Sequence, residues 1–136
     1  MLIHGVELNF DLYDSGNIKL RKRYFQELKK IQGIAKAMPK NADEKTQTEY
    51  LCGRIKKMFD KVFSPGTGDA VCGEGNNLLR CMQAYEQLVS DQIRQNKEYN
   101  AVMEKIRIIK NDSSSDLTEA GLIPLEMSGD MDESTD

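Results

Sequence analysis

The chain has little of what catalytic and metal-binding sites are made of. Its 136 residues include one histidine, His4, and three cysteines, Cys52, Cys72 and Cys81. The cysteines are odd in number and form no CxxC pair, which argues against a disulfide framework and a zinc site. No nucleophile stands beside a base, and no carboxylate pair lies in an apolar setting. We therefore predict a protein that is not an enzyme and uses no cofactor or metal.

Long hydrophobic runs are also absent. No apolar stretch approaches the roughly 20 residues that a membrane-spanning helix needs. The first ten residues lack the basic and then apolar form of a secretory signal. The glycine-bearing segment 64–76 has neither the spacing of a phosphate-binding loop nor the acidic ligands of an EF-hand. We expect a cytoplasmic protein with no membrane partner.

Charge is distributed unevenly along the chain. Residues 1–110 hold all 19 basic residues and 14 of the 22 acidic ones, whereas residues 111–136 hold eight acids and no base. The sequence therefore predicts a helical domain over residues 1–110 and an acidic, disordered tail over residues 111–136. One apolar island in the tail, Leu117–Met127, could dock as a short peptide on this chain or on a partner. We also consider that the acidic tail could lie across the basic first helix.

The segment 76–110 has the strongest pattern in the sequence. Its apolar positions recur at alternating steps of four and three, which predicts one long helix with a stripe close to a heptad seam. The first half of the stripe is apolar enough for a core. The second half carries Gln92 and Asn96, so we expect it to leave the domain and contact another chain. The predicted partner-binding residues are Tyr85, Val89, Gln92, Asn96, Tyr99, Met103 and Ile106.

The remaining patterns predict the rest of the fold. Residues 2–10 alternate as in two short strands with a turn at His4–Gly5. A first helix runs from an N-cap at Asp14 or Ser15 to Met38, before Pro39. A second begins with a capping box at Asn41 and ends near Phe63. In the connection 64–76, Val71 and Cys72 are predicted to turn inward. The fold class is mainly α: a small N-terminal β-hairpin packed on a bundle of three helices, the third long, with a flexible acidic C-terminal tail.

The first predicted helix has a basic face within residues 19–40. Such a face can contact phosphates, or it can be an ordinary solvated helix surface. No recognition-helix pattern or aromatic stacking platform supports nucleic-acid binding. We therefore favour the solvated surface and keep a small nucleic-acid-binding or regulatory protein as the alternative. The residues of this basic face are Lys19, Arg21, Lys22, Arg23, Lys29 and Lys30.

Two segments resemble a known family. The opening IHGVELNFDLYD, residues 3–14, and the block FDKVFSPGTGDAVCGEGNNLLRCMQAYEQLV, residues 59–89, are similar to small proteins from tail gene clusters of phages and prophages of Gram-positive bacteria. Members tend to begin with I-x-G-x-x-x-x-F-D and to carry a glycine-bearing elbow after an F-x-x-x-F helix end. The resemblance covers residues 1 to about 100. Ser64–Pro65 departs from the Gly-Glu-like pair expected at the elbow. The matching positions are Ile3, Gly5, Phe10, Asp11, Phe59, Phe63, Gly66 and Gly68.

The resemblance implies a role in phage tail morphogenesis, as a tail assembly chaperone in the cytoplasm of the bacterial host. Such a protein coats the long tape measure protein and gives way as tail-tube subunits polymerise. The expected partners are other protein chains, including further copies of this chain in a homo-oligomer. The resemblance supplies no catalytic residues.

Overall fold

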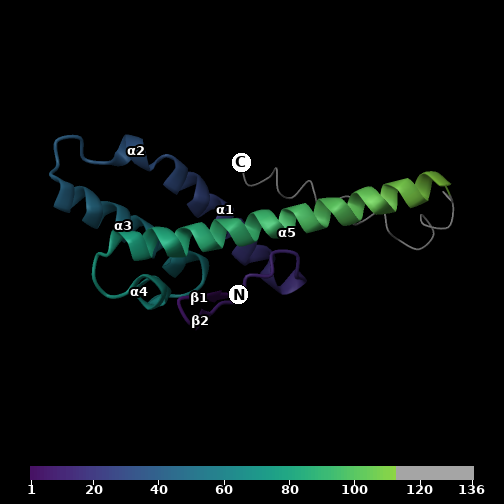
Figure 1. Ribbon diagram of the computed structural model, residues 1–136, viewed down its shortest axis with the longest axis horizontal. Helices are drawn as coiled ribbons and strands as arrows, with labels where there is room; N and C mark the ends of the chain where they lie inside the picture. The colour runs from purple at the N-terminus through teal and green to yellow at the C-terminus, as the bar shows by residue number, and fades with distance from the viewer. Residues whose placement is uncertain (113–136) are drawn as a thin grey trace. The chain divides into compact units, whose positions relative to one another are not determined.

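The computed structural model describes residues 1–112. The chain divides into two compact units, Met1–Ser90 and Asp91–Asp136, which we describe separately. The fold is mainly helical and begins with a two-stranded antiparallel hairpin, as the sequence predicted (Figure 1). The apolar island 117–127 and almost all of the predicted acidic tail lie outside the described residues, so the expected disorder and docking of the tail stay predictions.

The N-terminal hairpin pairs β1 (Leu2–Ile3) with β2 (Val6–Glu7). The predicted turn at His4–Gly5 is confirmed, and both of its residues have positive φ, 46° and 81°. The Nδ1 atom of His4 lies 2.6 Å from the carbonyl oxygen of Val71, within hydrogen-bond distance. Because a two-stranded hairpin is marginal alone, this contact and the burial of Ile3 fix the hairpin on the helices.

The first predicted helix is divided into three pieces. A 3-10 turn, η1 (Ser15–Asn17), precedes α1 (Ile18–Gln32) and the single turn α2 (Ile34–Ala37). Asp14, one of the two predicted N-caps, caps η1: its carboxylate accepts a hydrogen bond from the Gly16 amide at 3.0 Å. Asn17, directly before α1, makes no side-chain capping bond. The prediction of one helix to Met38 was wrong, because α1 ends at Gln32, before Gly33, a residue with low helix propensity.

The second predicted helix is α3 (Glu44–Val62). Its N-cap is Asp43, whose carboxylate accepts a hydrogen bond from the Thr46 amide at 2.9 Å. The capping box predicted at Asn41 was therefore wrong, since Asp43 stands directly before the first helical residue. The helix ends at Phe63, as the sequence predicted.

The glycine-bearing connection contains a short helix that the sequence did not reveal, α4 (Thr67–Cys72). Gly66 precedes it with φ of 92°, a left-handed conformation that glycine adopts without strain. Gly68 packs against α3: a Cβ atom at this position would lie 2.4 Å from the Lys56 carbonyl oxygen. The amide of Gly68 also donates a hydrogen bond to Asp60 Oδ1 at 2.7 Å. The contact with α3 therefore requires glycine at position 68.

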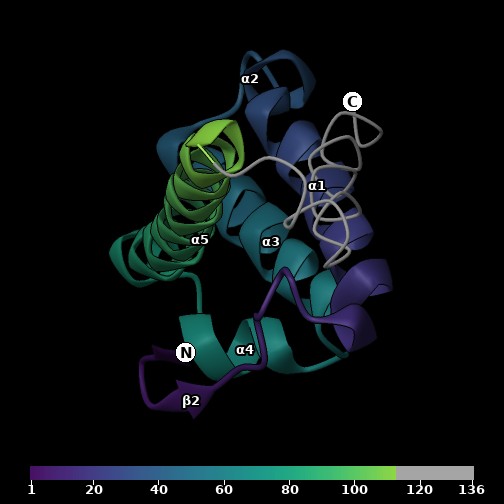
Figure 2. The same ribbon diagram turned by 90° about the vertical axis from the view of Figure 1, so that its right-hand side faces the viewer.

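The core of the first unit is enclosed by the hairpin and by α1, α3, α4 and the start of α5 (Figure 2). Phe10 and Tyr24 meet edge to face, with ring centroids 5.0 Å apart. Val71 and Cys72 are 0% and 1% exposed, which confirms that they turn inward. The buried side chains of α3 follow the predicted helical spacing: Cys52, Ile55, Met58, Phe59 and Val62.

The third predicted helix is α5 (Leu78–Asp112), drawn as one uninterrupted helix in Figure 1. Asn77 caps it by accepting a hydrogen bond from the Arg80 amide at 3.1 Å. Thirty-five residues give a helix about 52 Å long. The boundary between the two compact units falls within it, after Ser90.

Candidate functional site

The first half of α5, Leu78–Ser90, belongs to the core of the first unit. Cys81, Ala84 and Leu88 are each 0% exposed. They repeat at steps of three and four, so one face of the helix is buried throughout this half. Tyr85 and Val89, two predicted partner-binding residues, are half-buried at its border. Most of their surface is therefore not available to a partner.

The other predicted partner-binding residues lie in the second half, Asp91–Asp112. Gln92 is 8% exposed, so little of its surface is open to a partner. Gln95, which the sequence analysis did not select, is equally buried. Both amides are among the residues that make polar or electrostatic interactions. The remaining four, Asn96, Tyr99, Met103 and Ile106, are half-buried.

The structure adds two apolar residues that the sequence analysis missed. Val102 and Ile109 are 54% and 52% exposed. Together with Tyr99 and Ile106 they alternate at steps of three and four, so they share one helix face, which we call the apolar stripe. The sequence pattern contained this signal. It was missed because the predicted seam was extended from Tyr85 and Val89 rather than from the buried Cys81 and Leu88.

Charged residues surround the stripe in short-range pairs. Arg94 bridges Asp91 and Glu98, each at 2.9 Å, and Arg107 pairs with Glu104. The hydrogen bonds to both carboxylates raise the pKa of Arg94. These pairs lie three or four residues apart on one exposed helix, where solvent and salt screen them and each contributes little. They support the helix without covering the stripe.

The predicted basic face is partly used inside the first unit. Arg21 is 5% exposed and donates a hydrogen bond to the Leu12 carbonyl at 3.1 Å, so its assignment to a solvent-facing surface was wrong. Arg23 donates to the carbonyls of Lys61 and Val62 at 3.0 Å each, and Lys30 pairs with Glu27 at 3.1 Å.

Four of the six basic residues thus interact within the structure, because Lys29 also makes an interaction. Lys19, Lys22 and Lys29 are exposed. The face that the structure leaves for phosphate binding is smaller than the sequence suggested.

The three cysteines, far apart in the sequence, meet in the core. Cys52, Cys72 and Cys81 come from α3, α4 and α5, and Cys81 interacts electrostatically with both others. Burial and the contact with Cys81 raise the pKa of Cys52 to about 11, and burial raises the pKa of the other two thiols. All three therefore stay protonated near neutral pH and are weak nucleophiles.

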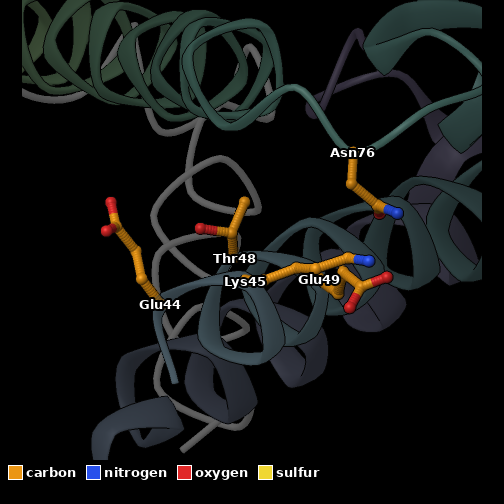
Figure 3. A pocket seen from close by; sticks show the side chains of 5 residues that line it. All are labelled: Glu44, Lys45, Thr48, Glu49 and Asn76. Carbon is orange, nitrogen blue, oxygen red and sulfur yellow. The ribbon is translucent and has the colours of Figure 1, made fainter. Parts of the chain in front are cut away.

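One open pocket lies beside the first turns of α3 (Figure 3). It is lined by Glu44, Lys45, Thr48 and Glu49 of that helix and by Asn76 of the connection before α5. Its lining holds neither histidine nor cysteine and combines two carboxylates with one ammonium group. Such a lining offers no nucleophile beside a base.

Within residues 1–112, no group of three histidine, cysteine or acidic side chains is placed to hold a metal ion, and this includes the three thiols. In the same part of the chain, no helix is long and apolar enough to cross a membrane.

Comparison with known proteins assigns the chain to a family. A family model described as a family of unknown function, DUF6673, matches residues 4–114. The match includes the hairpin turn, the glycine-bearing connection and the whole of α5, so the chain belongs to this family. Neither a curated protein nor a solved structure matches the chain.

Proposed function

We propose that this protein is a non-enzymatic assembly protein that binds other helical chains through the second half of α5. The observation that carries the proposal is the exposure of Val102 and Ile109 in the apolar stripe. Apolar residues at heptad spacing on an exposed helix face are typical of a surface that receives a partner helix. An assembly protein needs such a surface, and it needs no reactive group.

The partner that the sequence resemblance favours is the tape measure protein of a phage or prophage tail, with this protein acting as a tail assembly chaperone. The small size of the stripe supports a reversible role. Interfaces well below the standard size of about 1,600 Å² bind weakly, and a coat that gives way to tail-tube subunits must release its partner. If several linked copies bind along one tape measure protein, each copy stays near its site when it dissociates, and the overall binding is stronger than that of a single copy.

Co-expression with a tape measure protein from the same gene cluster tests the proposal. We expect the two proteins to co-purify. The matched variants are Ile109→Ser and Ile108→Ser, because Ile108 and Ile109 are 54% and 52% exposed but only Ile109 lies on the stripe.

Ile109→Ser should lower the co-purified amount by about tenfold, as expected for losing a buried isoleucine contact, and Ile108→Ser should leave it nearly unchanged. Failure of the unaltered protein to retain the tape measure protein contradicts the proposed function. Equal losses for the two variants would show that another face binds.

The alternative is a small nucleic-acid-binding or regulatory protein that uses the basic face of residues 19–40. The exposed Lys19 and Lys22 support it, whereas the buried Arg21 reduces the available charge. A DNA affinity that falls steeply with added salt, and that Lys19→Ala with Lys22→Ala removes, would favour this alternative over the assembly protein.

A further inference from the structure

We propose that the apolar stripe of α5 is covered by the chain's own segment Leu117–Met127, which a partner must displace. The stripe comprises Tyr99, Val102, Ile106 and Ile109, all on one face. The segment lies outside the described residues, and the proposal rests on its sequence, on its distance along the chain and on the stripe. Only the displacement rests on the proposed function.

The segment has suitable chemistry for this face. It carries five apolar side chains, which water disfavours, in an otherwise acidic stretch. Residues 113–136 contain seven acids and no base, whereas Lys105 and Lys110 lie along the last turns of α5, beside the pair of Arg107 and Glu104. Apolar contact would hold the segment on the stripe, and its acidic neighbours would meet these bases. The apolar residues of the segment are Leu117, Leu122, Ile123, Leu125 and Met127.

The chain is long enough to reach. Ile109 and Val102 lie about 5 and 15 Å before Asp112 along the helix, at 1.5 Å per residue. An extended chain covers about 3.3 Å per residue, so Leu117 can reach about 16 Å from Asp112 and Leu122 about 33 Å. After reversing direction beyond Asp112, the segment can therefore lie along the whole stripe.

Attachment favours this occupant over a second copy of the chain. A segment attached to its site through a few residues has an effective concentration of about a millimolar there. A second copy at micromolar concentration must bind about a thousandfold more tightly to compete. Charge disfavours the second copy as well: pairing two stripes antiparallel, with Val102 beside Ile106 of the other copy, brings the two Lys105 side chains together.

Paramagnetic relaxation in the full-length protein tests the contact. A nitroxide is attached to Ala101→Cys, an exposed position on α5 away from the stripe, and signals of residues 117–127 are measured with a nitrogen-15 label. The native thiols are buried with raised pKa values, so the introduced cysteine reacts first. We expect residues 117–127 to lose most of their signal, and residues 130–136 to keep theirs.

The matched variants identify the surface. Adding Ile109→Ser should restore the signals of 117–127, and adding Ile108→Ser should not. Leu122→Asp with Leu125→Asp in the tail should restore them too, and should raise retention of the tape measure protein by about tenfold, if displacement limits binding.

Three results would overturn the proposal. If the signals of residues 117–127 keep their intensity in the presence of the nitroxide, the segment does not cover the stripe. In a second sample, the nitroxide and the nitrogen-15 label are placed on different chains, which are then mixed. If signals are lost only in this sample, a second copy of the chain is the occupant. Signal loss caused instead by a nitroxide on Lys22→Cys places the tail on the basic face of α1. No other protein is present in this experiment, so its failure leaves the proposed function standing, and failed co-purification leaves this contact standing.

Discussion

The two halves of α5 have the same helical spacing but different surroundings. In the first half, the helix face that is continuous with the apolar stripe carries Cys81, Ala84 and Leu88, all 0% exposed. In the second half it continues with Val102 and Ile109, which remain about half exposed. Between the two groups the same face carries Gln92 and Gln95, each 8% exposed, so the apolar spacing of the first half resumes beyond a polar stretch. The comparison teaches that helical spacing of apolar residues does not by itself say whether a face is buried within the chain.

Replacing one apolar side chain in each half by alanine is the most direct test of this comparison. We expect Leu88→Ala to lower the free energy of unfolding by about 3–4 kcal/mol, because it leaves a cavity in a closed core. Val102→Ala should lower it by less than about 0.5 kcal/mol, as is usual at exposed positions. Urea unfolding monitored by circular dichroism measures both. Similar losses for the two variants would show that Val102 is also part of a core.

A second pair of variants tests how closely the first unit is packed. In Gly68→Ala the new Cβ would lie 2.4 Å from the Lys56 carbonyl oxygen, so α4 must move away from α3. We expect a loss of about 2–3 kcal/mol in urea unfolding. The control is Gly53→Ala within α3, where a Cβ meets no atom within 4 Å, and where alanine should add about 0.5–1 kcal/mol. A neutral Gly68→Ala would contradict the observed contact.

The sequence predicted the parts of the fold that depend on local pattern. The hairpin turn, the Asp14 cap, the end of α3 and the inward turn of Val71 and Cys72 all follow from short-range rules, and the structure confirms them. The break at Gly33 and the cap at Asp43 were missed because several residues at each place satisfy the same rule. Small differences in free energy then choose among them.

Contacts between distant parts of the chain could not be predicted from the pattern. Arg21 looked like one more charge on a basic face, but the Leu12 carbonyl and the ring of Tyr13 hold it inside. The meeting of three cysteines from three helices depends on the packing of α3, α4 and α5. For the candidate site, the long helix was predicted correctly, but its exposed stripe became visible only after the buried face of the first half fixed the register.

The buried ion pair of Glu27 and the exposed ion pairs of Arg94 should differ in how much they stabilise the protein. Glu27, 3% exposed, accepts hydrogen bonds from Arg54 at 2.7 Å and Lys30 at 3.1 Å. Burial alone would raise its pKa, but these bonds and charges outweigh burial and lower it. We expect Glu27→Gln to cost about 1–2 kcal/mol in urea unfolding at pH 7, whereas Arg94→Ala in the second half of α5 should leave the urea midpoint almost unchanged, because water screens its ion pairs.

The pH dependence of the Glu27 pair has a definite sign. Because the folded pKa is lowered, the stabilisation is complete above the ordinary glutamate value of about 4.3 and is lost as the pH falls towards the folded pKa. The difference between the unaltered protein and Glu27→Gln should therefore shrink below about pH 4. The exposed Glu49→Gln serves as the control. A difference that stays constant from pH 7 to pH 3 would show that the loss comes from packing and not from charge.

The smallest expected effect concerns the independence of the second half. Ala101→Gly places a residue of low helix propensity at an exposed position of α5, at a local cost of about 1 kcal/mol. Because that half contributes little to the core, we expect the urea midpoint of the first unit to stay unchanged. Amide exchange around residues 99–105 should become about fivefold faster, since opening there needs no unfolding of the rest. A lowered midpoint would mean that the exposed half of the helix also stabilises the core, and the division between the two halves would then be wrong.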